Sequence, residues 1–521
     1  MSLPVFKHTT SKFRELLTEE ADRISHLIKY DPIIAYLIYQ EVNKPCGTVE
    51  ITDFSQIVNY LGIKRIEQII LERDLFLEDE DLQIWIYGIL CAEICSSLSQ
   101  QFMYVHRDEA FFAGLMQCLG MVFMMTEFPK YRSIIHFLIK LPAEDRVFLE
   151  ESVFGTNHIE CLQRNIICPP FRDIVNILIK VFPKDGKKNL KSLSPPKGST
   201  LQSVYDLSIL SDIAAYGTRA LMFPSVVDNR ELYLELAKRY FRIKESDALE
   251  ALVNAMDRFL SVAEEFNVKE EIQFSTETVY PLRKFRFETK NPVFAKMLKQ
   301  LFEENAKDRN IYIYGEGATG KRLLAAALHT ADDNPRKEKP FIMIFSDIDS
   351  ELLEEEFLGV KEGYLGKKDK KGVLIQAEGG TLVIKEFDSM PKDFQEKFQK
   401  VIQSKRYYRL GDMIPTEFTD IKFIMVGRDD IRVKVAKGEF NGELLKLINP
   451  LFFRLLPLRE RREDVFYIAE EIIKKYNLIN IEQMLSQPDV IEKLKNDTFP
   501  GNLRDLKRYL FLLHINRLLK S

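Results

Sequence analysis

Apolar residues recur at helical spacing through the first half of the chain, with polar residues between them. This pattern predicts helices over residues 33–42, 54–61, 66–76, 82–98 and 110–125. The run at 110–125 is interrupted by Gln117 and is shorter than the ~18 apolar residues of a membrane span. We therefore expect a buried core helix there, and strand-like alternation is scarce before about residue 280.

The pattern changes after a polar stretch at residues 269–291. Short runs rich in β-branched and aromatic residues then alternate with helical segments, which indicates a parallel sheet with helices on both faces. The predicted strands cover residues 311–314, 341–345, 381–384 and 423–426. From residue 459 to Ser521 the chain is again helical, and the segment 184–200, rich in Lys, Ser, Pro and Gly, is predicted to be a loop.

A length of 521 residues accommodates two or three domains, and the 46% hydrophobic and 29% charged fractions are ordinary for a soluble protein. The net charge of -4 gives no general basicity that would indicate nucleic acid or an anionic membrane as a partner. The N-terminal residues lack the basic and then apolar pattern of a signal peptide. The six cysteines include no C-x-x-C pair, so we interpret them as reduced thiols of a cytoplasmic protein.

A glycine-rich segment follows the predicted strand at 311–314 and precedes a predicted helix at 323–328. Backbone N–H groups of such a loop surround phosphates, and the dipole of the following helix favours their negative charge. Lys321 would contact the terminal phosphates, whereas Arg322 stands where the usual pattern has the Ser or Thr that ligates magnesium. The candidate nucleotide-binding residues of this segment are Gly315, Glu316, Gly317, Ala318, Thr319, Gly320, Lys321 and Arg322.

The N-terminal half carries short motifs that are spread over its predicted helices. They are Leu3-Pro4, Asp31-Pro32, Asn43, Leu61-Gly62, Ala113-Gly114-Leu115, Phe154-Gly155 and His158. In these residues the segment 1–266 resembles the HDOD family, the HD-related output domains of bacterial signalling proteins. The resemblance implies an all-α domain with a protein-interaction or sensing role.

True HD phosphohydrolases place a His-Asp pair after the glycine-leucine stretch, but here Gln117-Cys118 replaces it. A catalytic metal needs several His and carboxylate ligands that converge on one ion. The histidines of this half occur singly, at His8, His26, His106, His136 and His158. We therefore expect this half to have neither a metal site nor phosphohydrolase activity.

The C-terminal half resembles the AAA+ domain of the sigma-54-dependent activators in several ordered motifs. Besides the glycine-rich loop, these motifs are Asn291-Pro292-Val293-Phe294, Glu378-Gly379-Gly380-Thr381-Leu382, Asp388-Ser389-Met390-Pro391 and the segments 407–411, 458–464 and 499–504. The resemblance implies a five-stranded parallel α/β subdomain at 282–458 and a helical lid at 459–521, joined to the HDOD-like domain by a linker at 267–281. It also implies ATP or ADP as the ligand, with the lid arginine Arg504 contributing to binding.

The departures from the activator pattern concern magnesium and hydrolysis. The Walker B strand of the family ends in Asp-Glu, but here it ends in Lys385-Glu386, and a lysine cannot ligate a cation. Glu386 is thus the one retained carboxylate of that motif, magnesium is not expected, and Lys385 would meet the phosphates directly. The two arginine fingers of the family align with Asn441 and Leu447, and losing such a finger costs ~10³ to 10⁵ in rate.

Two further segments differ from the family. The sensor segment is Gly427-Arg428 instead of Thr-Asn, and the loop that touches sigma-54 is shortened to Gly363-Tyr364-Leu365-Gly366. The basic run at 367–371 is either a solvated loop or a contact for an acidic partner. Because no helix-turn-helix follows the lid, we expect no direct DNA binding, while the partner protein and a homo-oligomer remain open.

We interpret the chain as a bacterial regulatory protein that binds ATP through a degenerate AAA+ domain without hydrolysing it. Retention of Gly320, Lys321 and Arg504 favours binding over turnover. One alternative is an active AAA+ ATPase that regulates sigma-54-dependent transcription, and another is an interaction scaffold without nucleotide.

Overall fold

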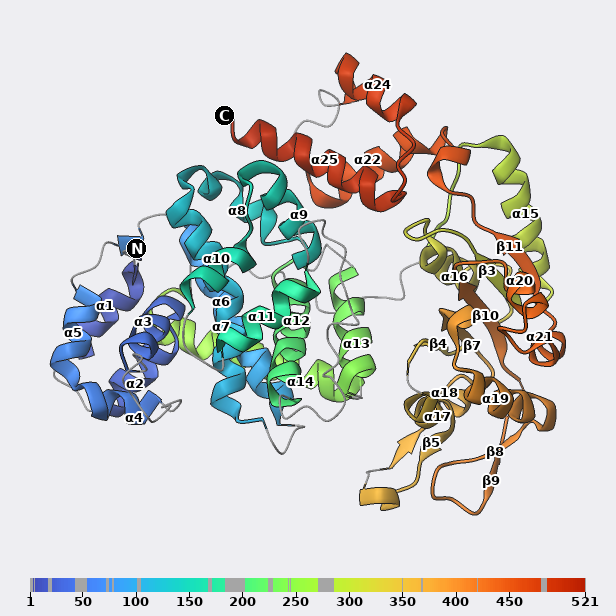
Figure 1. Ribbon diagram of the computed structural model, residues 1–521, viewed down its shortest axis with the longest axis horizontal. Coiled ribbons are helices and arrows are strands. Elements are labelled where there is room, and N and C mark those ends of the chain that lie inside the picture. The colour runs from blue at the N-terminus through green and yellow to red at the C-terminus, as the bar shows by residue number, and fades with distance from the viewer. Residues whose placement is uncertain are drawn as a thin grey trace. The chain divides into compact units, whose positions relative to one another are not determined.

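The computed structural model describes residues 3, 5–16, 21–42, 54–71, 75–76, 79–100, 105–166, 171–182, 202–223, 228–241, 243, 245–269, 285–348, 350–366, 369–418, 420–478 and 485–520. The chain divides into two compact units (Figure 1). The first unit comprises Met1–Val279 together with Phe511–Ser521, and the second comprises Tyr280–Leu510.

The first unit is built almost entirely from helices. They are α1 (Lys7–Leu16), α2 (Ala21–Lys29), α3 (Pro32–Val42), α4 (Phe54–Leu61), α5 (Ile63–Leu71), α6 (Asp79–Ser99), α7 (Arg107–Glu127), η1 (Pro129–Tyr131), α8 (Arg132–Leu138), α9 (Ala143–Phe154), α10 (His158–Asn165), α11 (Phe171–Val181), α12 (Gln202–Met222), α13 (Asp228–Phe241) and α14 (Glu245–Glu265). Two short strands, β1 (Val5–Phe6) and β2 (Leu75–Phe76), pair in parallel.

Helices α6 and α7 pack against each other in the interior of this unit and are contacted by α12. Both are long and apolar enough to cross a membrane by length and composition, but 89% and 83% of their apolar windows are buried inside the protein. The expected core helix at 110–125 is therefore confirmed as part of α7. Four free thiols are buried with these helices, as expected for core cysteines: Cys91, Cys95, Cys118 and Cys161.

The helix expected at 66–76 differs from the one observed. Gly62, with φ +74°, separates α4 from α5, so the helix begins earlier, at Ile63, and ends at Leu71. Leu75 and Phe76 pair instead with Val5 and Phe6, an interaction across 70 residues that local spacing does not reveal. The loop expected at 184–200, most of the linker expected at 267–281, and the residues Pro4, Asn43, Cys46 and Cys168 lie outside the described residues.

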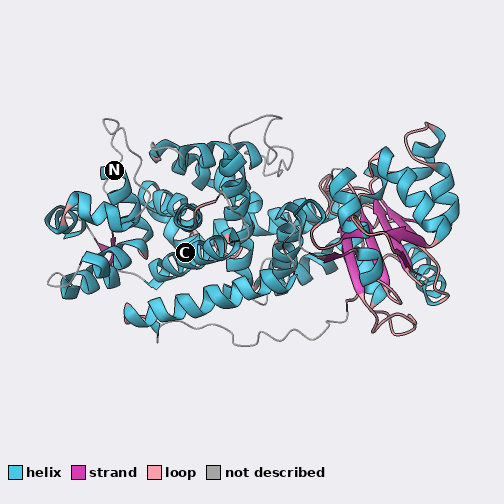
Figure 2. Ribbon diagram, turned by 90° about the horizontal axis from the view of Figure 1, so that it is seen from below, coloured by secondary structure: helices cyan, strands magenta, loops and turns pink. Residues whose placement is uncertain are grey.

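The second unit contains a five-stranded parallel sheet in the order β11-β3-β10-β7-β4. Its strands are β3 (Ile311–Tyr314), β4 (Phe341–Phe345), β7 (Thr381–Lys385), β10 (Lys422–Gly427) and β11 (Leu451–Arg454). The four strands predicted from periodicity are confirmed within a residue at each end. Figure 2 shows the sheet between layers of helices, so the α/β fold expected for this half is confirmed.

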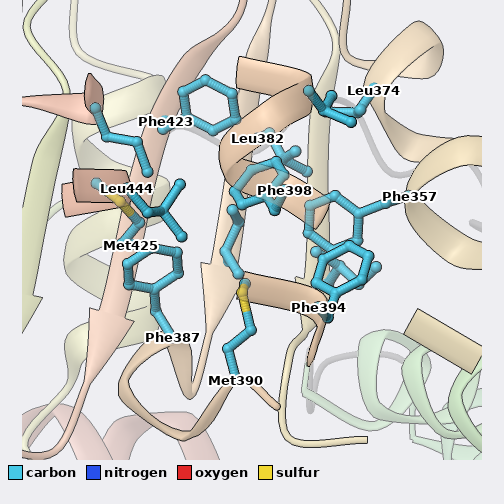
Figure 3. Close-up of a cluster of buried hydrophobic side chains, with 14 of the residues drawn as sticks. Phe357, Leu374, Leu382, Phe387, Met390, Phe394, Phe398, Phe423, Met425 and Leu444 are labelled. Carbon is cyan, nitrogen blue, oxygen red and sulfur yellow. The ribbon is translucent and has the colours of Figure 1, made fainter. Parts of the chain in front are cut away.

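Alternation along the strands divides the interior of this unit into two cores. Leu382 and Met425 face one core, together with phenylalanines from α17 (Ser350–Leu358) and α19 (Lys392–Ser404) (Figure 3). Val383 and Ile424, one residue away from them, face the other core with α15 (Pro292–Ala306) and α16 (Lys321–His329). Period-two alternation with both faces covered explains why these strands read as continuous apolar runs.

The remaining elements surround the sheet or follow it. They are β5 (Gly359–Val360), η4 (Tyr364–Gly366), β6 (Lys370–Lys371), α18 (Val373–Gln376), η5 (Phe387–Ser389), β8 (Arg406–Tyr408), β9 (Pro415–Glu417), α20 (Ile431–Ala436), α21 (Gly442–Ile448), η6 (Leu458–Glu460), α22 (Asp464–Tyr476), α24 (Pro488–Asn496) and α25 (Leu503–Leu518). The last three form the helical region predicted after residue 459.

Candidate functional site

The glycine-rich loop leaves the sheet at the carboxyl end of β3 and enters α16, the strand-loop-helix arrangement that the sequence predicted. Gly315 has φ +148°, and a Cβ there would lie 2.5 Å from the carbonyl oxygen of Leu455. Gly320 has φ +101° and lies at the start of α16, where the first turn of a helix leaves backbone N–H groups without intrahelical acceptors. Ala318 also adopts a positive φ, +54°. The loop therefore curls as a phosphate-binding loop does.

The side chain of Lys321 binds backbone carbonyl groups at the start of this loop. Its Nζ donates to the carbonyl oxygens of Gly315 and Glu316, at 2.5 and 2.6 Å. Burial lowers the pKa of Lys321, and the charge of Glu386 opposes that shift. An ammonium group held across the loop in this way is placed to meet an anion that enters it.

The outer side of the loop is bound by the segment that leads into the lid. Glu316 accepts a hydrogen bond from Arg459 Nη1 at 2.8 Å, and this contact lowers the pKa of Glu316 to about 2. Asn502 donates to the carbonyl oxygen of Gly317 at 3.1 Å, and Leu503 N–H donates to that of Ala318 at the same distance. The start of α25 thus touches the loop, one residue before Arg504, whose side chain is exposed.

A buried arginine, Arg461, also binds the backbone of this loop. Arg461 is 1% exposed and donates from Nη2 to the carbonyl oxygen of Thr319 at 2.7 Å. Its charge lies 3.5 Å from Asp464, which also accepts hydrogen bonds from the hydroxyl of Thr289 and from backbone N–H groups that precede α15. Arg461, 142 residues away from Thr319, therefore helps to fix the loop conformation, which sequence spacing around the glycines does not reveal.

A second group of charges lies at the carboxyl ends of β7 and β10. Glu386 follows β7 with φ +52°, an uncommon conformation for a residue other than glycine, and its Oε2 lies 3.2 Å from Nε of Arg428. Lys385 extends over the ring of Phe345, with Nζ 3.6 Å from the ring centroid. The structure therefore pairs Glu386 with Arg428 and places Lys385 against an aromatic ring on β4.

Family comparisons agree with this geometry. Residues 287–454 match the family model of the sigma-54 interaction domain, and residues 3–162 match that of the HDOD domain. The chain carries an HDOD domain followed by a sigma-54 interaction domain. The resemblances read from the sequence motifs are thus confirmed in both halves.

Curated relatives resemble this chain in the second half. The response regulator protein PilR of Pseudomonas aeruginosa is 36% identical over 204 residues, which are 38% of this chain and 45% of PilR. The DNA-binding transcriptional regulator NtrC of Escherichia coli strain K12 is 33% identical over 202 residues, 38% of this chain and 42% of NtrC. The match thus spans less than half the length of each relative. Among solved structures, NtrX from Brucella abortus in complex with ATP is 24% identical with a TM-score of 0.40, over 55% of this chain and 70% of NtrX.

Two carboxylates at this edge of the sheet, those of Asp388 and Glu386, are held by neighbouring cations and backbone N–H groups. Asp388 Oδ2 accepts the backbone N–H groups of Arg428 and Asp429 and lies 3.3 Å from Lys434 Nζ. Glu386 pairs with Arg428, at 3.2 Å. Within the described ranges, no group of three or more His, Cys, Asp and Glu side chains is arranged to hold a metal. Arg428 and Lys434 thus offset the negative charges of Glu386 and Asp388 at this edge of the sheet.

The two positions expected to correspond to arginine fingers, Asn441 and Leu447, carry uncharged side chains. Asn441 caps α21, since its Oδ1 accepts the N–H groups of Glu443 and Leu444 at 2.9 and 3.1 Å. Leu447 is 43% exposed and carries no charge. Neither side chain supplies a cation to a neighbouring nucleotide.

In the HDOD domain, the residues at the position of the HD metal pair make ordinary core contacts. Gln117 donates to the hydroxyl of Ser211 at 3.0 Å, and the thiol of Cys118 donates to the carbonyl oxygen of Leu115 at the same distance. His158 is buried and lies 2.6 Å from Glu150, through Nδ1. The Gln117–Ser211 contact joins α7 to α12 and the His158–Glu150 contact joins α10 to α9, whereas the Cys118 bond lies within α7.

Residues missed by the sequence analysis are those that act on the loop from elsewhere in the chain. Arg459 and Asn502 belong to motifs that the resemblance included, but their contacts with Glu316 and Gly317 became evident only in the fold. Arg459 lies in η6 and Asn502 directly precedes α25, and neither position is marked by a local pattern that indicates a contact with the loop.

Proposed function

We propose that the sigma-54 interaction domain of this chain binds ATP or ADP at the loop 315–320 and does not hydrolyse it. The chain would then act as a regulator in which nucleotide occupancy conveys a signal. The observation that carries the proposal is the loop itself, with Lys321 Nζ 2.5 Å from the carbonyl oxygen of Gly315 and with Arg459, Arg461 and Asn502 holding its shape.

The absence of turnover is proposed from the chemistry of the surrounding side chains. An attacking water needs a free carboxylate to polarise it, and the transferring phosphoryl group needs cations placed by magnesium or by arginine fingers. In this domain Glu386 is paired with Arg428, Lys385 replaces the metal-binding carboxylate, and the finger positions hold Asn441 and Leu447. Each change affects a different step, so their combination favours binding alone.

Exposed apolar residues of the same domain support a role for a protein partner. The shortened loop at Gly363–Gly366 contains Leu365, which is 78% exposed. The β8–β9 hairpin exposes Met413 at 94%. Lys361 joins the two segments, with its Nζ 3.2 Å from Asp412. We propose that this tip contacts a protein and that direct contact with DNA is not required for the chain to act.

Calorimetric titration of the whole chain with ATP and with ADP tests the proposal, together with a phosphate-release assay. We expect both nucleotides to bind, and Lys321→Ala to weaken each by about tenfold or more, because a charge-assisted contact with phosphate is lost. The matched control is Lys337→Ala, which removes an exposed lysine paired with Asp332.

Three outcomes separate the alternatives. Binding without phosphate release supports the proposal. Phosphate release that disappears in the Lys321→Ala variant would instead establish an active ATPase. No binding of either nucleotide by the native chain would leave the interaction scaffold.

A further inference from the structure

We propose that the HDOD domain binds a small monovalent anion, of the size of chloride, between the guanidinium group of Arg219 and the first turn of α13. The observation that carries this proposal is a fully buried arginine whose charge has no carboxylate partner among the described residues. The site belongs to the first unit, so the proposal does not depend on nucleotide binding by the second.

Arg219 lies in the last turn of α12 and is 0% exposed. Its Nη1 donates to the hydroxyl oxygen of Tyr87 at 3.3 Å, and its Nε donates to Oδ1 of Asn229 at 3.4 Å. The guanidinium also lies over the ring of Tyr216, 4.4 Å from the centroid. Its Nη2 has no hydrogen-bond partner among the described residues. Because a guanidinium is permanently charged and carries five N–H donors, this side chain keeps both unsatisfied donors and an uncompensated charge.

Carboxylates of the same domain bind other groups. Glu150 accepts a hydrogen bond from the hydroxyl of Tyr131 at 2.5 Å. Glu144 accepts from the hydroxyl of Tyr216, at 3.2 Å to Oε1, whereas Arg219 lies over the face of that ring. In the part of the chain that the structure describes, no carboxylate forms an ion pair with Arg219. An external anion would supply the missing negative charge.

A second buried arginine, Arg146, shows how the chain otherwise satisfies such a group. Its three nitrogen atoms all have acceptors at 3.1 to 3.3 Å, namely the sulfur of Met121 and the carbonyl oxygens of Leu138 and Leu141. Arg146 also lies 5.6 Å from the ring centroid of Tyr87, so both arginines approach the same phenol. Burial raises the pKa of Tyr87, and the charges of Arg146 and Arg219 oppose that shift. Two positive charges in one buried region increase the benefit of a bound anion.

Asn229 supplies further donors from the start of α13, which packs against α12 (Figure 1). Asn229 is 1% exposed and lies in the first turn of this 14-residue helix, and its Nδ2 has no partner among the described residues. The first N–H groups of a helix lack intrahelical acceptors, and the helix dipole is positive at that end. Because Arg219 Nε binds Oδ1 of the same amide, the unsatisfied Nη2 and Nδ2 groups flank one hydrogen bond. An anion seated there accepts from both side chains and faces the positive end of α13.

Burial and charge together select a small anion. Arg219, Tyr87 and Asn229 are all buried, so they offer no solvent-facing side for the remainder of a nucleotide, a sugar phosphate or a peptide. A water molecule could accept from the N–H donors, but it would leave the buried guanidinium without a counter-charge, which is costly. A chloride ion meets both requirements, since it neutralises one charge and accepts from N–H groups of several directions. The stability of the HDOD domain then depends on the concentration of this anion.

Thermal unfolding of the whole chain without nucleotide, in chloride or in gluconate at equal ionic strength, tests the proposal. Gluconate serves as the reference because it is too large for a closed site. We expect the midpoint of the HDOD transition to rise by roughly 3–10 °C when chloride exceeds its Kd about 10- to 100-fold. Chlorine NMR measures binding directly, and the chloride resonance should show excess line broadening that added bromide reverses.

Asn229→Asp is the decisive variant, because it keeps the shape of the side chain and replaces the unpartnered amide nitrogen with a carboxylate oxygen. The new carboxylate would pair with Arg219 at the positive end of α13 and so take the place of the anion. We expect its midpoint in gluconate to reach or exceed that of the native chain in gluconate. The difference between chloride and gluconate should disappear, together with the excess line broadening. Arg219→Met, which removes the charge and keeps the chain length, should also lose the chloride response.

The matched control is Arg65→Gln, which removes an exposed arginine of the same unit that is paired with Glu41, and it should keep the full chloride response. Equal midpoints of the native chain in chloride and gluconate, without excess line broadening, would overturn the proposal. An equal chloride response in the native chain and in Asn229→Asp would overturn it as well, since the anion would then bind elsewhere. Either result leaves the proposed nucleotide binding untouched.

Discussion

At the scale of single residues, burial decides which ionisable groups hold their ordinary charge. His329 is 1% exposed at the end of α16, with Nδ1 3.0 Å from the hydroxyl of Thr381 and its ring centroid 4.7 Å from that of Phe341. Burial lowers the pKa of His329 to about 4, and the nearby charge of Lys422 adds to the shift. The neutral ring is therefore part of the folded sigma-54 interaction domain.

The lowered pKa of His329 predicts a loss of stability in mild acid. Unfolded His has a pKa near 6.5, so between about pH 6.5 and 4 the unfolded chain binds a proton that the folded chain does not. At pH 5 this linkage costs about 2 kcal/mol, and at pH 7 almost nothing. His329→Gln should therefore reduce the stability difference between pH 7 and pH 5 by about that amount. Denaturant unfolding at both values measures it, and an unchanged difference would contradict the assignment.

At the scale of elements, two glycines let α6 and α7 approach each other. A Cβ at Gly114 would lie 2.5 Å from Cα of Ala92 and 2.6 Å from the carbonyl oxygen of Cys91, both backbone atoms of α6. A Cβ at Gly88 would instead lie 2.6 Å from the sulfur of Cys118, at the end of a side chain. The Ala-Gly-Leu motif of the HDOD resemblance is thus a packing requirement of this helix pair.

Gly114→Ala should destabilise the chain by roughly 1–3 kcal/mol, because α6 must move to admit a methyl group in a closely packed core. Gly88→Ala is the matched comparison, since its methyl group meets a side chain that can rotate, and alanine is the better helix former by up to about 1 kcal/mol. Thermal unfolding of both variants measures the contrast. Equal costs would show that backbone approach at Gly114 is not the limiting contact.

At the scale of the whole molecule, the proposed loss of hydrolysis is spread over separate elements. Lys385 ends β7 and Glu386 follows it, Arg428 follows β10, and Asn441 caps α21. A substitution that restores the activator residue at one of these positions leaves the other positions different from the activator pattern. A return to turnover therefore needs several substitutions in different parts of the sigma-54 interaction domain.

Lys385→Asp tests this distribution, because it restores the carboxylate that relatives use to organise magnesium. We expect the native chain to bind ATP with similar affinity in magnesium and in chelator, and the variant to become dependent on magnesium. We also expect no phosphate release from the variant, since Asn441 and Leu447 still supply no cation. Collapse of native ATP binding in chelator would contradict the proposed role of internal cations.

The sequence by itself indicated five helices of the first half, one of them displaced, as well as the parallel strands of the second half and the place of the loop 315–320. These follow from periodicity and from glycines at fixed spacing, which are local properties of the chain. Contacts between distant segments were decided only by the tertiary structure: Leu75 pairs with Val5, Arg461 holds Thr319, and Lys385 lies over Phe345 instead of pointing freely at the phosphates. The contacts of a side chain at the edge of a sheet depend on which strands are neighbours. Local sequence patterns do not determine strand order, so they could not predict these contacts.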